Sequence, residues 1–395
     1  MNKYLFILGL VGTAVLTACS SDDLTTGFSP EDENALVAEA SKDSDVPITL
    51  GLVGGRSSGM TRTPIESDDD DLFTIGGGQL GVFCLAAGKQ TGAPSTVLED
   101  INWKDDPLAT WLNNVPASVK KEGGYSYVEF RKFSPSAAID RYYPSGNWYY
   151  YDFYAYYPRV GSADISISAG SDGKKAYFAS TTIDGTKDII WGQAIGEDNS
   201  HQRIFTLDGS TKVYAYSSKF SRLNSAVVPE FDFKHKLTQL VFYVKAHDTA
   251  AAAEFSGSGI KVADLYLKDV DTKFELCIAS MSNDSEHGYT PGKLKLPASR
   301  VQGNIKVYKT GTNSDAFDGG ATTYPVATSS TDTDPKMIGY AMVPPIAASD
   351  NYEVQIVVKD GGENDYYNRS YTVTPPAEGF QAGKKYNIEL DIKKK

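Results

Sequence analysis

The sequence predicts an all-β protein built from antiparallel β-sandwiches, and two observations carry this prediction. The first is composition: the 395 residues include 25 tyrosines and 36 glycines, and a chain rich in Tyr, Thr and Gly favours strands over helices. The second is an alternation of apolar and polar residues along several segments, which is typical of strands with one buried and one solvated face. Helical candidates are few and short, at residues 107–113 and 249–254.

The beginning of the chain has the pattern of a bacterial lipoprotein signal. Lys3 precedes an apolar run at residues 4–16, and small residues then lead to Cys19. A run of this length is typical of a signal peptide and is too short for a comfortable membrane span. We therefore expect residues 1–18 to be a signal peptide and Cys19 to be lipidated, which anchors a chain firmly in a membrane. The alternative is an ordinary secretory leader with an incidental cysteine.

Residues 19–45 are predicted to form an acidic, flexible tether. Eight carboxylates accompany a single lysine between residues 20 and 46, and self-repulsion with low hydrophobicity favours flexibility. The start of this tether, residues 20–23, resembles the acidic signal that sends lipoproteins of the Bacteroidetes to the outer cell surface. The whole chain is acidic, with 38 basic and 50 acidic residues and a net charge of −12. It therefore lacks the basic footprint of a nucleic-acid-binding protein.

Four segments of the folded part show the alternation most clearly. Gly, Pro, Ser and Asp clusters separate the expected strands. A break near residues 217–229 divides the folded part into an N-terminal sandwich domain at residues 46–220 and a C-terminal one at residues 221–395. The apolar positions of the four segments are Ile48, Leu50 and Leu52; Leu240, Phe242, Val244 and Ala246; Tyr352, Val354, Ile356 and Val358; and Tyr386, Ile388, Leu390 and Ile392.

The sequence contains no recognisable catalytic or metal-binding pattern. Its four histidines lack the spacing of a zinc site, and it has neither a nucleophile elbow nor a phosphate-binding loop. The acidic run at residues 68–71 lacks the spaced ligands and the glycine of a calcium loop. Cys84 and Cys277 lie in apolar, strand-like runs and are expected to be buried free thiols, with a disulfide as the alternative. We expect a protein without enzymatic activity, cofactor or metal.

The tyrosines are unevenly distributed, and ten of the 25 lie between residues 125 and 157. Alternate side chains of a strand point to opposite faces, so Tyr154 and Tyr156 are expected to lie opposite Phe153 and Tyr157. One interpretation is a strand with aromatic rows on both faces, stabilised by cross-strand pairs. The other interpretation is an exposed platform on which sugar rings stack.

The same region resembles a known family. Residues 153–158, with the sequence Phe-Tyr-Ala-Tyr-Tyr-Pro, resemble the aromatic strand of the fimbrillin family, the pilus subunits of Bacteroidales. The resemblance implies two transthyretin-like antiparallel β-sandwich domains. It also implies a structural subunit (tip, accessory or stalk) of a cell-surface fimbria that supports adhesion. Further matches follow in the family's order at residues 61–63, 81–83, 188–191, 233–237 and 383–386.

The resemblance implies a route of assembly by donor-strand exchange. The lipoprotein precursor reaches the outer membrane, and a trypsin-like, Arg-specific protease cuts after an arginine in the loop behind the first strand. The released strand leaves a groove, which the C-terminal strand of a neighbouring subunit fills. The implied partners are therefore other fimbrial subunits, the processing protease, the outer membrane through the lipid anchor, and a ligand on a host or bacterial surface.

This sequence has a counterpart for each part of that route. The strand to be displaced is the segment with Ile48, Leu50 and Leu52, and the candidate cleavage sites are Arg56 and Arg62. Both arginines lie in a Gly- and Ser-rich stretch, and loops of small polar residues are where proteases cut. The possible donor strand carries the alternating residues Tyr386, Ile388, Leu390 and Ile392.

One departure from the family pattern concerns this last strand. Only lysines follow Ile392 in the sequence, so we expect residues 386–392 to pair within their own domain. That expectation fits a tip, accessory or anchoring position better than a repeating stalk. The alternative function is a monomeric surface lipoprotein that binds polysaccharide through exposed Tyr and Trp, and it requires a coplanar row of exposed rings.

Overall fold

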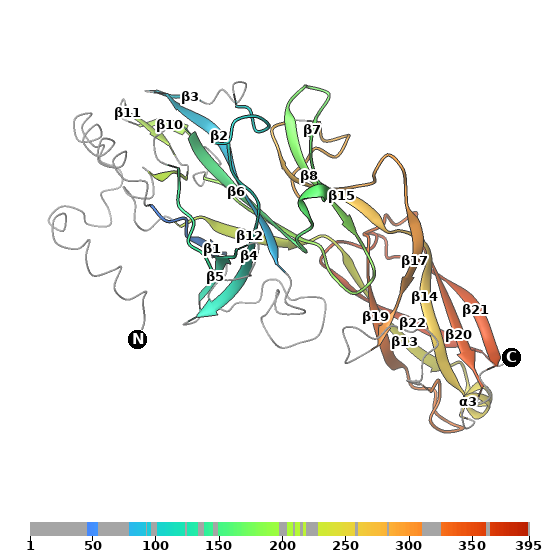
Figure 1. Cartoon of the computed structure of the whole chain (residues 1–395). Helices are drawn as coiled ribbons and strands as arrows, with labels where there is room; N and C mark the ends of the chain where they lie inside the picture. The colour runs from blue at the N-terminus through green and yellow to red at the C-terminus, as the bar shows by residue number, and fades with distance from the viewer. Residues whose placement is uncertain are drawn as a thin grey trace.

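The computed structural model consists almost wholly of β-strands (Figure 1), which confirms the predicted all-β class. Cys19, Arg56, Arg62 and the acidic run at residues 68–71 lie outside the residues that it describes. Within the described part of the chain, no helix is long and apolar enough to cross a membrane. The described residues are 46–53, 79–91, 93–95, 101–122, 125–132, 138–144, 149–196, 204–207, 210–213, 216–218, 228–256, 260–282, 284–309, 325–360 and 364–393.

The first body of the structure is a sheet of eight strands, of which seven close into a ring and the eighth, β3, pairs with β2 outside it. The strand order is β3-β2-β4-β5-β1-β12-β9-β6, and β2 also pairs with β6. The closed sheet surrounds the aromatic-rich part of the hydrophobic core. Its strands are β1 (Leu50–Leu52), β2 (Leu80–Thr91), β3 (Ala93–Ser95), β4 (Thr110–Glu122), β5 (Tyr125–Phe130), β6 (Tyr149–Tyr157), β9 (Ile190–Ala194) and β12 (Glu230–His235).

The second body is a sandwich of two four-stranded sheets. One sheet has the order β18-β19-β13-β22 and the other the order β17-β14-β20-β21. Apolar side chains from both sheets belong to one hydrophobic core. The strands are β13 (Thr238–Ala246), β14 (Lys261–Asp271), β17 (Gln302–Lys306), β18 (Tyr308–Lys309), β19 (Lys336–Val343), β20 (Tyr352–Lys359), β21 (Asp365–Val373) and β22 (Lys385–Ile392).

A third sheet, the bridging sheet, combines strands from both halves of the chain. Its order is β16-β15-β8-β7, and in Figure 1 it lies between the two bodies. The smaller elements are the 3-10 helix η2 (Ser162–Asp164), a hairpin of β10 (Ile204–Leu207) and β11 (Ser210–Val213), and the helix α3 (Thr249–Phe255). The strands of the bridging sheet are β7 (Ile165–Ala169), β8 (Lys175–Thr182), β15 (Lys273–Ser280) and β16 (Leu294–Lys295).

The predicted boundary between residues 46–220 and 221–395 does not separate the hydrogen-bonded sheets. β12 follows residue 220, yet it pairs with β1 and β9 of the first body. β15 also follows residue 220, yet this strand pairs with β8 of the N-terminal half. Such pairings over long sequence separations leave no mark on local alternation, which is why the sequence did not reveal them.

The predicted alternation is confirmed in β20, whereas residues 239–242 of β13 are buried on both faces. Leu240, Phe242 and Val244 of β13 have no exposed surface, and Val354 and Ile356 of β20 are buried in the same core. Burying such a side chain completely stabilises a fold by about 1.5–3 kcal/mol relative to leaving it exposed. In β20 the inward residues supply this energy at every second position, and in β13 Val241 of the opposite face, which has no exposed surface, adds to it.

One of the two helical candidates is correct. α3 begins after Asp248, whose side chain accepts a hydrogen bond from the N–H of Ala251 at 2.8 Å, as an N-cap aspartate does. The other candidate, residues 107–113, is wrong because its second half begins β4. The preceding turn is closed by the side chain of Asp106, which accepts a hydrogen bond from the N–H of Leu108 at 2.8 Å.

Strand β6 buries all nine of its residues. On one face, the ring of Phe153 lies 6.1 Å from that of Tyr143. On the other face, the Tyr156 ring lies 6.3 Å from Phe83, and its hydroxyl donates a hydrogen bond to Asn114 Oδ1 at 2.9 Å. The interpretation as a strand with aromatic rows on both faces is confirmed, so β6 offers no exposed platform for sugar rings.

Cys84 and Cys277 are both buried free thiols, so the alternative of a disulfide between them is wrong. Burial raises the pKa of the Cys84 thiol and raises that of Cys277 to about 12. Because the thiolate is the reactive form, we expect neither residue of the folded protein to react with iodoacetamide at neutral pH. Mass spectrometry before and after denaturation checks this, and labelling of either residue in the folded protein would contradict it.

The two bodies are fixed to one another where the chain passes from β12 to β13. Asp188, in the connection between β8 and β9, pairs with the imidazole of His235 and accepts a hydrogen bond from the N–H of Leu237 at 3.3 Å. Asp188 and His235 are 7% and 9% exposed, and burial raises the pKa of Asp188. The same connection reaches the second body, where the N–H of Met342 donates to the carbonyl of Gly185 at 2.8 Å.

Lys236, beside this pair, is a partly buried cation. Its ammonium lies 4.8 Å from the centre of the Trp191 ring, and burial, Lys234 and Lys293 lower its pKa from 10.5 to about 8. Between these two values the unfolded chain holds more protons on this side chain than the folded chain does. The contribution of Lys236 to the free energy of unfolding therefore rises with pH across that interval.

We expect Lys236→Met to remove this rise. Urea unfolding of the variant and of the unaltered protein at about pH 7 and about pH 10 measures it. The unaltered protein should gain more stability with pH than the variant does. The same change in unfolding free energy in both proteins would contradict the prediction.

Candidate functional site

The first described strand occupies an interior place in the closed sheet. β1 runs antiparallel to β5, with Leu50 opposite Val128, and parallel to β12, with Leu52 opposite Phe231. A strand in this position leaves its sheet only if the hydrogen bonds along both of its edges open. We call the space that residues 46–53 fill between β5 and β12 the β1 slot.

Hydrogen bonds hold residues 46–53 beyond the three residues of β1 itself. In addition to the ladder of β1 with its neighbours, two backbone bonds join the upstream half to residues 141–143, and two join the downstream half to residues 229–231. Each backbone bond contributes about 0.5–1.5 kcal/mol net. The four bonds run from Ile48 N–H to Arg141 O (2.8 Å), from Tyr143 N–H to Val46 O (2.9 Å), from Gly51 N–H to Pro229 O (2.8 Å) and from Val53 N–H to Phe231 O (2.9 Å).

The side chains of this segment point alternately into the core and into solvent. Val46, Ile48 and Leu50 are 7%, 6% and 0% exposed, whereas Thr49 is exposed and Leu52 is half-buried. At about 1.5–3 kcal/mol for each buried aliphatic side chain, the three inward residues contribute about 4.5–9 kcal/mol of gross burial energy. The segment therefore completes the core of the first body.

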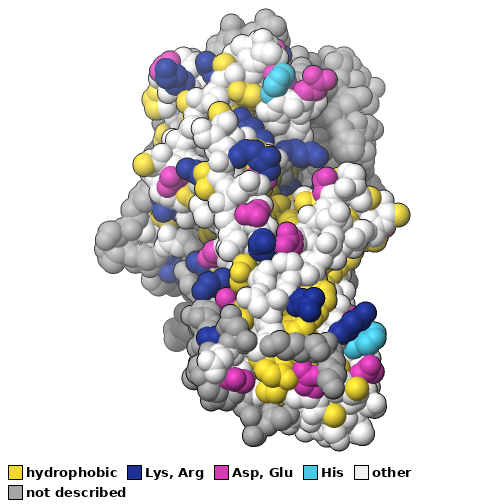
Figure 2. All heavy atoms as spheres, turned by 90° about the vertical axis from the view of Figure 1, so that its right-hand side faces the viewer, with side chains coloured by type: hydrophobic (Ala, Val, Ile, Leu, Met, Phe, Trp, Pro, Cys, Tyr) yellow, Lys and Arg dark blue, Asp and Glu magenta, His cyan; other side chains and the backbone are white. Residues whose placement is uncertain are grey.

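The outer rim of the β1 slot is polar and carries both signs of charge. Glu230, Asp232 and Lys234 of β12 are exposed, and the ammonium of Lys234 lies 3.1 Å from the carboxylate of Asp232. Basic and acidic side chains are also interspersed on the face of the molecule that Figure 2 shows. Neither surface presents the single-sign field that attracts a polyanion.

The last described strand, β22, lies in the second body at the edge of its sheet. It runs parallel to β13 over eight residue pairs. Leu390 and Ile392 are 1% and 0% exposed, whereas Tyr386 and Ile388 are half-buried. The structure thus pairs residues 386–392 within their own body, as we expected from the sequence.

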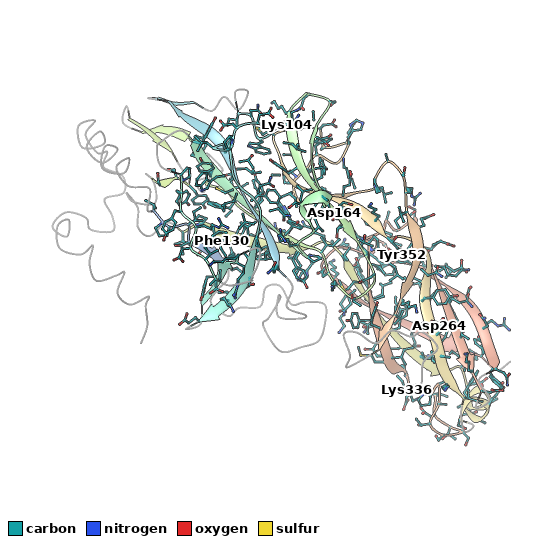
Figure 3. All side chains as sticks on the ribbon, in the orientation of Figure 1. Lys104, Phe130, Asp164, Asp264, Lys336 and Tyr352 are labelled. Atoms are coloured by element: carbon teal, nitrogen blue, oxygen red, sulfur yellow. The ribbon has the colours of Figure 1, made fainter. Side chains whose placement is uncertain are left out.

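The first strand and the possible donor strand do not meet within one chain. β1 belongs to the first body and β22 to the second (Figure 1). Figure 3 shows side chains filling both bodies, with Phe130 of β5 near the β1 slot and Tyr352 of β20 in the second body. Any exchange between these two strands therefore joins separate copies or separate subunits.

Sequence reasoning missed three parts of this arrangement. Val46 continues the inward alternation of Ile48 and Leu50, and that pattern could have identified it. Residues 141–143 pair with the upstream half of the segment without a strand-like pattern of their own. Asp188 and His235 lie 47 positions apart, and no local signal connects them.

Within the described residues, no group of three His, Cys, Asp or Glu side chains is placed to hold a metal ion. Several of these histidines and aspartates pair with one another instead. His247, for example, lies 2.8 Å from Asp391, and Asp284 accepts a hydrogen bond from His287 at 2.6 Å. Among the described residues, the feature that bears on assembly is the β1 slot.

Known proteins similar to this chain include one with a solved structure. That structure, of a proposed cell adhesion protein from Bacteroides eggerthii DSM 20697, is 11% identical in sequence. The match covers 89% of this chain and 87% of that chain, with a TM-score of 0.34. Similarity this low carries no argument about the present chain. None of the curated proteins compared matches it.

The sequence also matches the model of a protein family. The family is described as fimbrillin-like, and the match extends over residues 76–395, which is most of the chain. This family is structural and non-enzymatic, and membership implies association with other fimbrial subunits at the cell surface. The chain belongs to the fimbrillin-like family.

Proposed function

We propose that the chain is a structural subunit of a cell-surface fimbria, in a tip, accessory or stalk position, and that it supports adhesion. It is exported as a lipoprotein and anchored in the outer membrane through Cys19. A trypsin-like protease cuts after Arg56 or Arg62, and the first strand, with Ile48 and Leu50, leaves the β1 slot. A strand of a neighbouring subunit then enters the slot by donor-strand exchange.

The observation that carries this proposal is the interior position of residues 46–53 in the closed sheet. Only residues 54–79 connect this segment covalently to β2 and the rest of the body, so one cut there leaves it held by non-covalent contacts alone. The remaining strands stay joined through the β4–β5, β9–β12 and β2–β6 pairings. Cleavage therefore opens a strand-wide groove in a body that keeps most of its sheet.

An entering strand has to present an apolar residue at every second position. Four such residues supply about 6–12 kcal/mol of gross burial energy, from which the cost of ordering the strand is subtracted. β22 has this pattern, but donating it would uncover Leu390 and Ile392 and open its pairing with β13. This supports a tip, accessory or anchoring position, in which the chain accepts a strand and donates none.

Limited digestion with an Arg-specific protease tests the proposal. We expect the first cut after Arg56 or Arg62, because the surrounding residues are small and polar. The cleaved body should stay folded and should join candidate partner subunits in complexes that resist mild denaturant. N-terminal sequencing identifies the cut, and size-exclusion chromatography with light scattering measures the assembly.

The matched variants separate the role of these arginines from a general effect of charge. The Arg56→Ala, Arg62→Ala double variant should remain uncut in this stretch and monomeric. Arg300→Ala removes an exposed arginine that pairs with Asp271 at 2.6 Å, and it should be cut and assemble normally. Cleaved protein that stays monomeric in the presence of partner subunits would refute the proposal.

The aromatic residues of β6 and the two buried tryptophans give no support to the alternative of polysaccharide binding, which is left with side chains such as the exposed Tyr142 and the half-buried Trp111. The tyrosines of β6 are buried, and Trp103 and Trp191 are 3% and 5% exposed. Their indole N–H groups donate to backbone carbonyls of Ala86 and Ile278 at 2.9 Å. These rings serve the core and are not free to stack on sugars.

A further inference from the structure

One segment of the chain, made of two strands joined at a bend, passes from the first body into the second. β12 ends at His235 and β13 begins at Thr238, so only Lys236 and Leu237 separate a strand of the first body from a strand of the second. Figure 1 shows β12 in the first body and β13 in the second. We call residues 230–246 the spine.

The first and last described strands both run parallel to the spine. β1 pairs in parallel with β12, and β22 pairs in parallel with β13. Among the strand pairs of the described residues, these two are parallel and the others are antiparallel. The spine is therefore flanked by one end strand in each body, and each end strand runs in the direction of the spine strand beside it.

This arrangement decides how tension along the chain reaches the hydrogen bonds. When Lys393, just after β22, is pulled away from the first body, β22 is loaded at its far end and β13 at its near end. Two parallel strands loaded at opposite ends slide past one another, so all the bonds between them resist together. If the same strands are loaded at neighbouring ends, they peel apart and the bonds open one pair at a time.

The ladder of hydrogen bonds between β13 and β22, which we call the joint, is arranged to resist loading at opposite ends of the two strands. The two strands pair over eight residues, and further backbone bonds close both ends of the ladder, from Gln239 N–H to Lys384 O (3.0 Å) and from His247 N–H to Ile392 O (2.9 Å). Leu390, at the far end, is 1% exposed. If β22 slides along β13, the whole ladder of hydrogen bonds breaks and Leu390 becomes exposed in the same step.

The link between the two halves of the spine is held on both sides. The N–H of Lys236 donates to the carbonyl of Ile189 at 2.7 Å, and the carbonyl of Leu237 accepts from the N–H of Gly383 at 2.7 Å. The Asp188 carboxylate adds the bond to the N–H of Leu237 described above. The chain bends at Leu237, and these contacts hold that bend to both bodies, so load passes through a crossing that is bonded on either side.

We propose that residues 230–246 are the load-bearing element of this protein and that β22 is attached to them in shear. Tension between the first body and the end of β22 passes through the covalent spine and then through the whole β13–β22 ladder. The joint therefore resists pulling along the chain far better than it resists peeling. This mechanical function follows from strand direction and does not depend on whether the β1 slot exchanges strands.

Single-molecule force spectroscopy on the full chain tests the proposal with two handle placements. Lys234, Lys384 and Lys393 are exposed, and the native Cys84 and Cys277 are buried. With the third native cysteine removed by Cys19→Ser, introduced cysteines are selective attachment points. Lys234→Cys with Lys393→Cys loads the joint in shear, and Lys234→Cys with Lys384→Cys peels β22 from its start. Forced unfolding reports the unfolding rate under load.

We expect the first rupture force to be several times higher in the shear placement than in the peeling placement at the same loading rate. Leu390→Ala weakens the far end of the ladder, so it should lower the shear force and leave the onset of peeling unchanged. Urea unfolding without load shows that the two handle variants are equally stable. Equal rupture forces in the two placements, or a shear force that Leu390→Ala leaves unchanged, would overturn the proposal.

Discussion

Leu50→Asp is expected to expel residues 46–53 from the β1 slot without any proteolytic cut. Leu50 is completely buried at the centre of the segment, and the substitution removes its apolar burial and places a carboxylate in the core. Large-to-small core substitutions and unpaired buried charges each cost several kcal/mol, so we expect the free energy of unfolding to fall by about 3–5 kcal/mol. Urea unfolding measures this loss.

Hydrogen exchange shows whether the strand itself leaves. The amides of Ile48, Gly51 and Val53 donate to backbone carbonyls on the two sides of the slot, and they should lose their protection in Leu50→Asp. Thr49→Asp is the matched control, because Thr49 is exposed and the same carboxylate there should change stability by less than about 0.5 kcal/mol. Protected amides in Leu50→Asp would show that the slot tolerates the charge.

Asp188→Ala is expected to loosen the connection between the two bodies. The substitution leaves the buried imidazole of His235 without its carboxylate and the N–H of Leu237 without its acceptor. Nε2 of His235 already has no hydrogen-bond partner among the described residues, so the ring would be buried with none. Removing one member of a buried pair costs about 3–5 kcal/mol, and chemical denaturation measures that loss.

Two companion variants separate the pair from its surroundings. Asp184→Ala removes an exposed carboxylate of the same connection, and its effect should be about 1 kcal/mol or less. The Asp188→Leu, His235→Phe double variant replaces both polar partners and should recover part of the stability lost in Asp188→Ala. A double variant less stable than Asp188→Ala would show that packing, and not the lost pair, causes the effect.

Local sequence pattern accounts for the strands and for much of the core. The alternation of Leu240, Phe242 and Val244 identified β13, and the helical candidate at residues 249–254 located α3. These features depend on neighbours within a few residues, because side-chain direction repeats every second residue in a strand and capping is local. The β1 segment was found for the same reason.

The order and direction of the strands lie beyond local pattern. Alternation is the same for parallel and antiparallel partners, so nothing in Tyr386 or Ile388 indicated that β22 runs parallel to β13. The boundary expected near residue 220 failed to divide the sheets for a related reason, since β15 finds its partner β8 about one hundred residues away.

The pairing of β2 with β6 closes the sheet of the first body. This closure determines how many donor strands a subunit can accept once its first strand has left. β5 and β12 are then the two edges that face the vacancy, about 10 Å apart because one strand is missing between them. A single incoming strand bonds to both edges and leaves neither free for another. Each subunit would therefore hold one donor strand only, so this site could not become a branch point of a filament.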